Sequence, residues 1–226
     1  MFLVVFQSCS LRSVDASGIH SEKSAALPAF THLTLSGNFT FILKPADNSS
    51  ILLKGDSTFL DHMSFSVDKK KLVIESRRDW KGADPPVVEV YTNEPIRQLE
   101  LAGLVKAVSQ RRMEADKFQL DMAGAARADL NIRANELMVN QSGASQLKIS
   151  GAVETFLLNS AGASYTDARN LPSRNLKTNL SGASKAEVFA IDRLNVTLSG
   201  ASSLKYAGSP AIKSKISGNG TLSVIQ

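Results

Sequence analysis

The chain has 226 residues, enough for one or two domains with a sizeable hydrophobic core. Its 43% hydrophobic and 21% charged residues exclude a largely disordered chain and a protein that crosses the membrane several times. The net charge of +5 comes from dispersed basic residues without interleaved aromatics, which argues against a nucleic-acid partner.

The first nine residues resemble the end of a bacterial lipoprotein signal. Met1 to Phe6 are apolar, Ser8 is small, and Cys9 follows. In such signals the cysteine becomes the lipidated first residue of the mature chain. We therefore expect residues 1–9 to be a partial signal, Cys9 to carry the lipid, and the Ser-rich residues 10–26 to form a flexible tether. The alternative is an ordinary hydrophobic N-terminus with an incidental cysteine.

The next segment, residues 27–96, is rich in predicted strands but has no regular repeat. Residues 33–43 form a strand–Gly–strand unit, and Lys69–Lys71 is typical of an exposed hairpin tip between two apolar strands. Further strands are expected at residues 51–53, 65–67, 72–74 and 87–91, with turns at 47–50, 54–56 and 81–86. These irregular coils are expected to cap one end of a repeat stack.

Residues 97–226 contain a repeat of small residues around a glycine, most often Ser-Gly-Ala-Ser. The intervals between the glycines are 21, 19, 19, 20, 18 and 18 residues. Most residues six and four positions before the glycines, and four and six positions after them, are apolar. The exceptions are Arg97, Ser109, Thr166, Thr178 and Ser214. The corner glycines are Gly103, Gly124, Gly143, Gly162, Gly182, Gly200 and Gly218.

Alternating apolar positions on both sides of a small corner predict two strands per repeat, each with one buried face. One such unit cannot bury its own apolar face, so successive units must stack. We therefore predict an all-β fold, a single-stranded right-handed parallel β-helix of 18–21 residues per coil, as one domain over residues 27–226. A β-sandwich is the alternative.

A polar column lies three positions before each glycine. Its first members are Glu100, Asp121, Asn140, Asn159 and Asn179, followed by Thr197 and Lys215. Asn side chains stabilise stacked parallel strands by hydrogen bonding along the stack. We therefore interpret the column as a structural ladder, and a row of ligand-binding groups remains the functional alternative.

Several of these motifs, in this order, resemble a known family of bacterial proteins. They are Leu33–Asn38, Lys54–Asp56, Lys71–Ile74, Tyr91–Ile96 and Leu99–Gly103, followed by the Ser-Gly-Ala-Ser series. The chain is similar over residues 27–226 to the putative auto-transporter adhesin head GIN domain, a domain of unknown function common in Bacteroidetes. The resemblance implies a β-helical, extracytoplasmic protein, often with a lipoprotein-like N-terminus. Two features depart from the family: the short signal and the large residues of Gly103-Leu-Val105.

Few residues suggest catalysis. Asp167 and Glu187 are expected to be neighbours on successive coils, and paired carboxylates can cleave sugar chains. The alternating Asp129, Lys148 and Asp167 instead favour a surface charge ladder. The Gly-Ala-Ser repeats lack the second glycine of a nucleophile elbow, and His20, His32 and His62 match no zinc spacing. We expect no catalytic, cofactor-binding or metal-binding residues.

These observations favour a non-enzymatic lipoprotein of the outer membrane, on its surface or periplasmic face. It would use a rigid solenoid for adhesion, scaffolding, or binding of a protein or glycan partner, and a homo-oligomer is possible. The membrane would be reached only through the lipid anchor. A β-helix carbohydrate-active enzyme and an envelope sensory or regulatory module are the alternatives.

Overall fold

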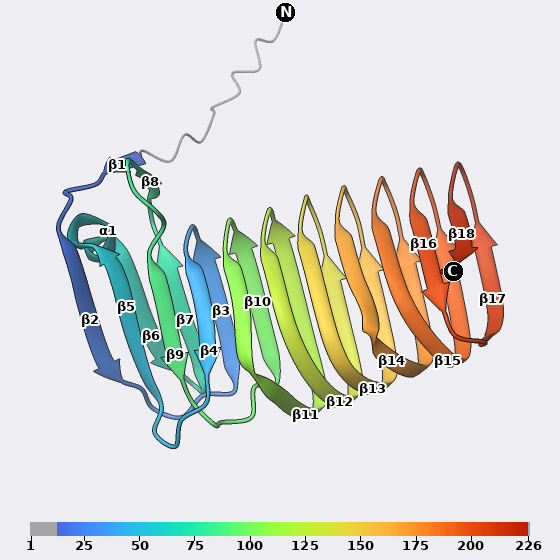
Figure 1. Ribbon diagram of the computed structural model, residues 1–226, viewed down its shortest axis with the longest axis horizontal. Helices are drawn as coiled ribbons and strands as arrows, with labels where there is room; N and C mark the ends of the chain where they lie inside the picture. The colour runs from blue at the N-terminus through green and yellow to red at the C-terminus, as the bar shows by residue number, and fades with distance from the viewer. Residues whose placement is uncertain (1–12, 226) are drawn as a thin grey trace, which may run out of the picture.

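The two strands predicted on either side of each corner glycine stack in parallel on those of the next coil, and the result is a β-solenoid (Figure 1). The computed structural model describes residues 13–225. The expected all-β, parallel, coiled fold is confirmed. Cys9 and the expected signal at residues 1–9 lie outside the described residues.

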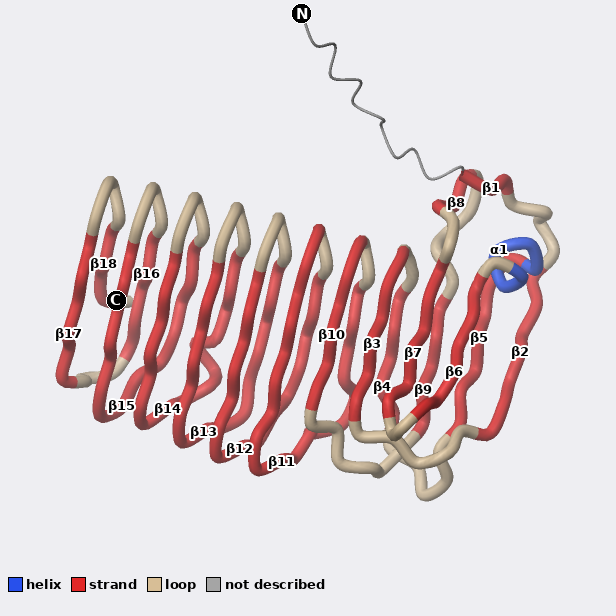
Figure 2. Tube along the Cα trace, turned by 180° about the vertical axis from the view of Figure 1, so that it is seen from behind, coloured by secondary structure: helices blue, strands red, loops and turns tan. Residues whose placement is uncertain are grey.

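Each regular coil consists of two sheet layers joined by a tight corner on one side and a bend on the other (Figure 2). We call the layer that leads into the corner glycine the pre-corner sheet, and the layer that leaves it the post-corner sheet. Most strands run through the bend and belong to both. The strands are β10 (Gln98–Gly103), β11 (Lys106–Gly124), β12 (Arg127–Gln141), β13 (Gln146–Ser160), β14 (Tyr165–Leu180), β15 (Lys185–Leu198), β16 (Ser203–Ala207), β17 (Ala211–Ile216) and β18 (Thr221–Val224).

The unequal coil lengths are absorbed away from the corners. Gly103 pairs with Gly124, and Val108 with Asp129, but the register then shifts before Arg112 pairs with Asn131. Similar shifts follow Lys148 in β13 and Ala168 in β14. Such irregularities let one coil hold extra residues while its neighbours keep their pairing. The corners therefore stay aligned although the repeat length varies.

The core lies between the two sheets and is built from the predicted apolar columns. Phe118, Leu137 and Phe156 lie above one another and are at most 2% exposed. The last coil differs, because every residue of β17 is exposed and Ile212 is 43% exposed. A coil at the end of the stack has a neighbour on one side only, so its apolar residues are exposed although they belong to the same columns.

The corner glycines have positive φ and are stacked closely. At Gly143, φ is +76°, and an added Cβ would lie 2.6 Å from the carbonyl oxygen of Gly124. That oxygen accepts a hydrogen bond from the Ala144 N–H at 2.8 Å. The corner therefore needs glycine both for its backbone conformation and for room beside this hydrogen bond. The large Leu104 is tolerated because its side chain points outward and is 54% exposed.

The N-terminal coils join the same two sheets in a different chain order. β3 (His32–Gly37) and β4 (Thr40–Lys44) form a regular coil, with Gly37 paired to Gly103. β7 (Lys71–Ser76) and β9 (Val87–Tyr91) form the next coil outward. Antiparallel strands β5 (Ser50–Asp56), β6 (Met63–Asp68) and β2 (His20–Ala26) close this end. The predicted hairpin tip is confirmed at Lys69–Lys70, between β6 and β7.

Two N-terminal details differ from expectation. Residues 10–26 were expected to be a tether, but β1 (Ser13–Asp15) pairs with β8 (Asp79–Lys81), and β2 covers the edge of β5. The turn expected at residues 54–56 is the end of β5, followed by helix α1 (Ser57–Asp61). Asp56 begins that helix, because its side chain accepts hydrogen bonds from the N–H groups of Thr58 and Gly18.

Candidate binding face

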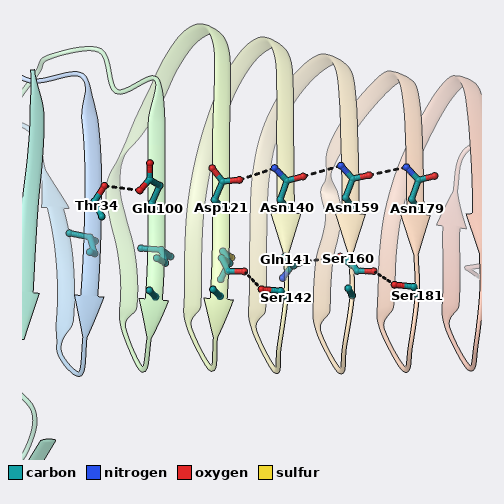
Figure 3. Close-up of a pocket in the computed structure, with 16 residues that line it drawn as sticks. Thr34, Glu100, Asp121, Asn140, Gln141, Ser142, Asn159, Ser160, Asn179 and Ser181 are labelled. Carbon is teal, nitrogen blue, oxygen red and sulfur yellow. Dashed lines mark hydrogen bonds between the residues drawn. The ribbon is translucent and has the colours of Figure 1, made fainter. Parts of the chain in front are cut away.

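From Asp121 to Asn179, the polar column of the pre-corner sheet forms a ladder of hydrogen bonds (Figure 3). Asn140 donates to Asp121 at 2.7 Å, Asn159 to Asn140 at 2.9 Å, and Asn179 to Asn159 at 2.8 Å. Every amide donates toward the N-terminal end, and the chain of donors ends on the Asp121 carboxylate. The structural ladder predicted from the sequence is therefore present.

The ladder is interrupted where two carboxylates are neighbours. Glu100 and Asp121 are register partners on adjacent strands. Glu100 accepts hydrogen bonds from Thr34 at 2.9 Å and Gln98 at 2.9 Å, and its carboxylate lies 3.3 Å from the Lys71 ammonium. Asp121 accepts from Gln119 at 2.7 Å. Each carboxylate is thus satisfied by its own neighbours, and this end of the face is acidic.

A trough runs along the solenoid beside the ladder, from β3 to β14, with a volume of about 710 Å³. The ladder residues form one rim of this trough. Its floor is made of the small side chains one position before each glycine, which are Ala102, Ala123, Ser142, Ala161 and Ser181. Ser142 and Ser181 turn their hydroxyls toward carbonyl groups of the preceding coil at 3.4 Å. The floor is therefore smooth and largely apolar, and the rim is polar.

The ladder is able to bind a ligand as well as to join coils. A primary amide has two N–H donors and two acceptor lone pairs. Asn140 and Asn159 each use one donor and one acceptor within the ladder, which leaves one of each for a ligand. The structural and functional interpretations of this column are therefore compatible.

The structure contains a buried polar cluster behind the trough that the sequence analysis does not predict. Gln141 is 4% exposed, and its side-chain carbonyl accepts hydrogen bonds from Ser160 at 3.0 Å and from Thr166. The Ser164 and Thr178 hydroxyls are buried nearby in the core without a hydrogen-bond partner among the described residues. The corner repeat contains a signal for such buried hydroxyls, because the serines two positions after Gly143, Gly162, Gly182 and Gly200 are buried.

The candidate catalytic pair is held in an ion-pair network. Asp167 and Glu187 are register partners, as predicted, and Arg169 lies 2.8 Å from Asp167 and 3.1 Å from Glu187. The hydrogen bond from Arg169 lowers the pKa of Asp167 although partial burial opposes this. Lys148 also pairs with Asp129 at 3.3 Å, as the predicted charge ladder requires. Arg169 bridges both carboxylates, and this ion-pair network joins successive coils.

The described part of the chain contains no group of three or more metal-ligating side chains. Across residues 13–225, no helix has the length and hydropathy needed to cross a membrane.

Comparisons with known proteins agree with this architecture. A family model described as putative auto-transporter adhesin, head GIN domain, matches residues 29–210. A search of curated proteins found no match. A solved structure of a putative adhesin from Bacteroides fragilis has a TM-score of 0.85 at 16% identity, covering 94% of this chain and 100% of that one.

Two structures from Parabacteroides are also similar. A putative adhesin from Parabacteroides merdae has a TM-score of 0.70 at 14% identity, covering 95% of this chain and 100% of that one. A putative lipid binding protein from Parabacteroides distasonis has a TM-score of 0.72 at 17% identity, with the same coverage. At these identities the likeness shows the fold alone.

Proposed function

The chain belongs to the putative auto-transporter adhesin, head GIN domain family, and from this premise we propose that it is a non-enzymatic, adhesin-like protein of the bacterial envelope that binds an extended sugar chain along its trough. The observation that carries the proposal is the continuous trough across the coils from β3 to β14, with a polar rim and a floor of small side chains. Extended binding surfaces of this kind are typical of solenoid proteins.

The spacing of the ladder favours a sugar chain over a peptide. Neighbouring coils are ~4.8 Å apart, so the trough offers one amide group per ~4.8 Å. This repeat is close to the length of one sugar ring in an extended chain. An extended peptide places side chains on one face only every ~6.6–6.8 Å, out of step with the ladder. The small floor residues leave room for ring faces, and the amides supply paired donors and acceptors for hydroxyl groups.

Envelope attachment is part of the same proposal. The resemblance of residues 1–9 to a lipoprotein signal supports Cys9 as the point of lipid attachment. Similar solved structures are named putative adhesins, which supports an envelope role for this chain. One similar structure is named a putative lipid binding protein, so a lipid is included among the ligands to be tested.

Obstruction of the trough floor tests the proposal. Wild-type protein is screened against an array of neutral and acidic oligosaccharides and against lipid vesicles, and the strongest sugar ligand is titrated. Ala161 lies in the floor and is replaced by Trp, and the matched control is Ala163→Trp, on the other side of the same corner glycine and also exposed. We expect Ala161→Trp to abolish sugar binding and Ala163→Trp to retain it. Failure of the wild type to bind any sugar, or equal loss in both variants, would overturn the proposal.

A further inference from the structure

Folding gathers three lysines at the C-terminal end of the pre-corner sheet, beyond the trough. Lys177 in β14 pairs in register with Asn195 in β15, and Asn195 pairs with Lys213 in β17. Lys215 is two residues further along β17 and continues the ladder column. All three lysines are exposed and line a shallow depression of about 370 Å³. They are separated by up to 38 residues in the chain, and the glycine alignment places Lys177 and Lys213 in one column, five positions before the corner glycine.

No carboxylate of residues 13–225 lies within ion-pair distance of these lysines. The pre-corner segments around them, residues 175–181, 193–199 and 211–217, contain no acidic residue at all. Arg193 adds a further exposed cation on the same face of β15. Several other exposed cations of this solenoid pair with acidic side chains on adjacent coils, as Lys117 does with Glu136 at 2.9 Å and Lys148 with Asp129 at 3.3 Å. The lysines therefore form an uncompensated positive region.

The charge of the face that carries the trough therefore changes from one end of the solenoid to the other. Its N-terminal end holds the Glu100 and Asp121 carboxylates, with Lys71 3.3 Å from Glu100. Its centre holds neutral amides, and at its C-terminal end all the charged side chains are cations. A neutral chain would leave the lysines unused, and a negatively charged chain would be repelled only where it reaches Glu100 and Asp121. A charge gradient of this kind orients a bound chain.

We propose that the ligand of this face is an acidic sugar chain, whose carboxylate or sulfate groups bind Lys177, Lys213 and Lys215 while its ring hydroxyls bind the amide ladder. The inference rests on the proposed function and specifies its ligand. By the geometry of strands and sheets, Lys213 and Lys215 are ~7 Å apart along one strand, and Lys177 is ~10 Å from Lys213 across two coils. Groups at these spacings can contact acidic substituents on successive or alternate rings.

Other polyanions fit this face less well. A nucleic acid would need aromatic side chains for base stacking, and the three segments around the lysines contain none. A membrane surface would favour apolar side chains on the same face as the cations, and that face carries Asn195, Thr197 and Asn179. The exposed Ile212 and Ile216 alternate with the lysines along β17 and therefore lie on its other face. The continuation of the amide column into the lysines favours a linear, hydroxyl-rich ligand.

Paired probes separate the charge of the ligand from its shape. The full chain is titrated with an oligogalacturonate and with its methyl ester, which has the same rings without the charge, and likewise with dextran sulfate and dextran. We expect the charged form of at least one pair to bind about tenfold more tightly at low salt, since it adds three exposed and individually weak ion pairs. The preference should shrink as salt is added.

Two variants complete the test. Lys177→Gln, Lys213→Gln and Lys215→Gln together should remove the preference for the charged form. Lys81→Gln, Lys106→Gln and Lys185→Gln change the same charge at exposed positions elsewhere and should keep it. Equal binding of charged and uncharged probes would overturn the acidic-ligand inference but leave the proposed function standing. No binding of any of these probes would also overturn the acidic-ligand inference, and the proposed function falls with it only if the oligosaccharide array yields no ligand either. Tighter binding to anionic vesicles than to every sugar would overturn the sugar assignment.

Discussion

Replacement of a corner glycine by alanine tests how the coils are held together. Gly143→Ala adds a Cβ that would lie 2.6 Å from the Gly124 carbonyl oxygen and 3.1 Å from the Gly124 nitrogen. Alanine in the left-handed conformation costs ~1–2 kcal/mol. Relief of the contact requires the coils to separate at the corner, and overpacking of this kind costs ~1–3 kcal/mol. We therefore expect a total destabilisation of ~2–5 kcal/mol.

Gly18→Ala is the matched control for backbone conformation. Its φ is +77°, against +76° for Gly143, but no atom lies within 4 Å of its added Cβ. Urea unfolding followed by circular dichroism should show only the conformational cost of ~1–2 kcal/mol for Gly18→Ala. If the two variants lose the same stability, close stacking at the corner contributes nothing and the explanation given for the glycine column is wrong.

Four further predictions concern stability, acid sensitivity and attachment. Phe156 is fully buried between the sheets, so Phe156→Ala should lower the free energy of unfolding by ~3–5 kcal/mol in urea titrations. Asn159→Ala removes two ladder hydrogen bonds at an exposed position and should cost only ~1 kcal/mol; a loss as large as that of Phe156→Ala would contradict a ladder open to solvent. Burial raises the pKa of Glu89, but hydrogen bonds from Lys44 and Tyr91 outweigh it and lower the pKa to about 2. Because the folded pKa is depressed, this stabilisation is complete above pH ~4.5 and about 3 kcal/mol is lost as pH falls toward 2. The acid branch of the unfolding profile should therefore flatten in Glu89→Gln, and an unchanged profile would count against this ion-pair cluster. Cys9→Ala should abolish incorporation of a labelled fatty acid and release the protein from the membrane fraction, whereas an unchanged distribution would remove Cys9 as the anchor.

The regular half of the fold was predictable because its pattern is repeated. Each coil contributes one residue to each apolar column, so single exceptions such as Arg97 or Ser214 do not hide the pattern. The Asn ladder and the pairing of Asp167 with Glu187 followed from the same alignment, since register in a parallel stack is set by the glycine corners. The roles of side chains within a column were therefore readable from spacing alone.

The N-terminal half was less predictable because its contacts are not between successive repeats. β2 and β6 run antiparallel at the sheet edges, and helix α1 depends on Asp56, which is also bound by Gly18 from a distant segment. The hydrogen bonds of the buried Gln141 and the depression lined by the lysines of β14 and β17 were also not predicted. Such features depend on which coil faces which, and no single repeat contains that information.

Mapping of a bound sugar by nuclear magnetic resonance tests the central claim most directly. Addition of an oligogalacturonate to isotopically labelled protein should shift the side-chain amide signals of Asn140, Asn159 and Asn179, together with the ammonium-bearing side chains of Lys177 and Lys213. Signals of the opposite sheet, such as those of Tyr165, should remain in place. Shifts confined to the post-corner sheet, or none at all at saturating sugar, would contradict binding along the trough.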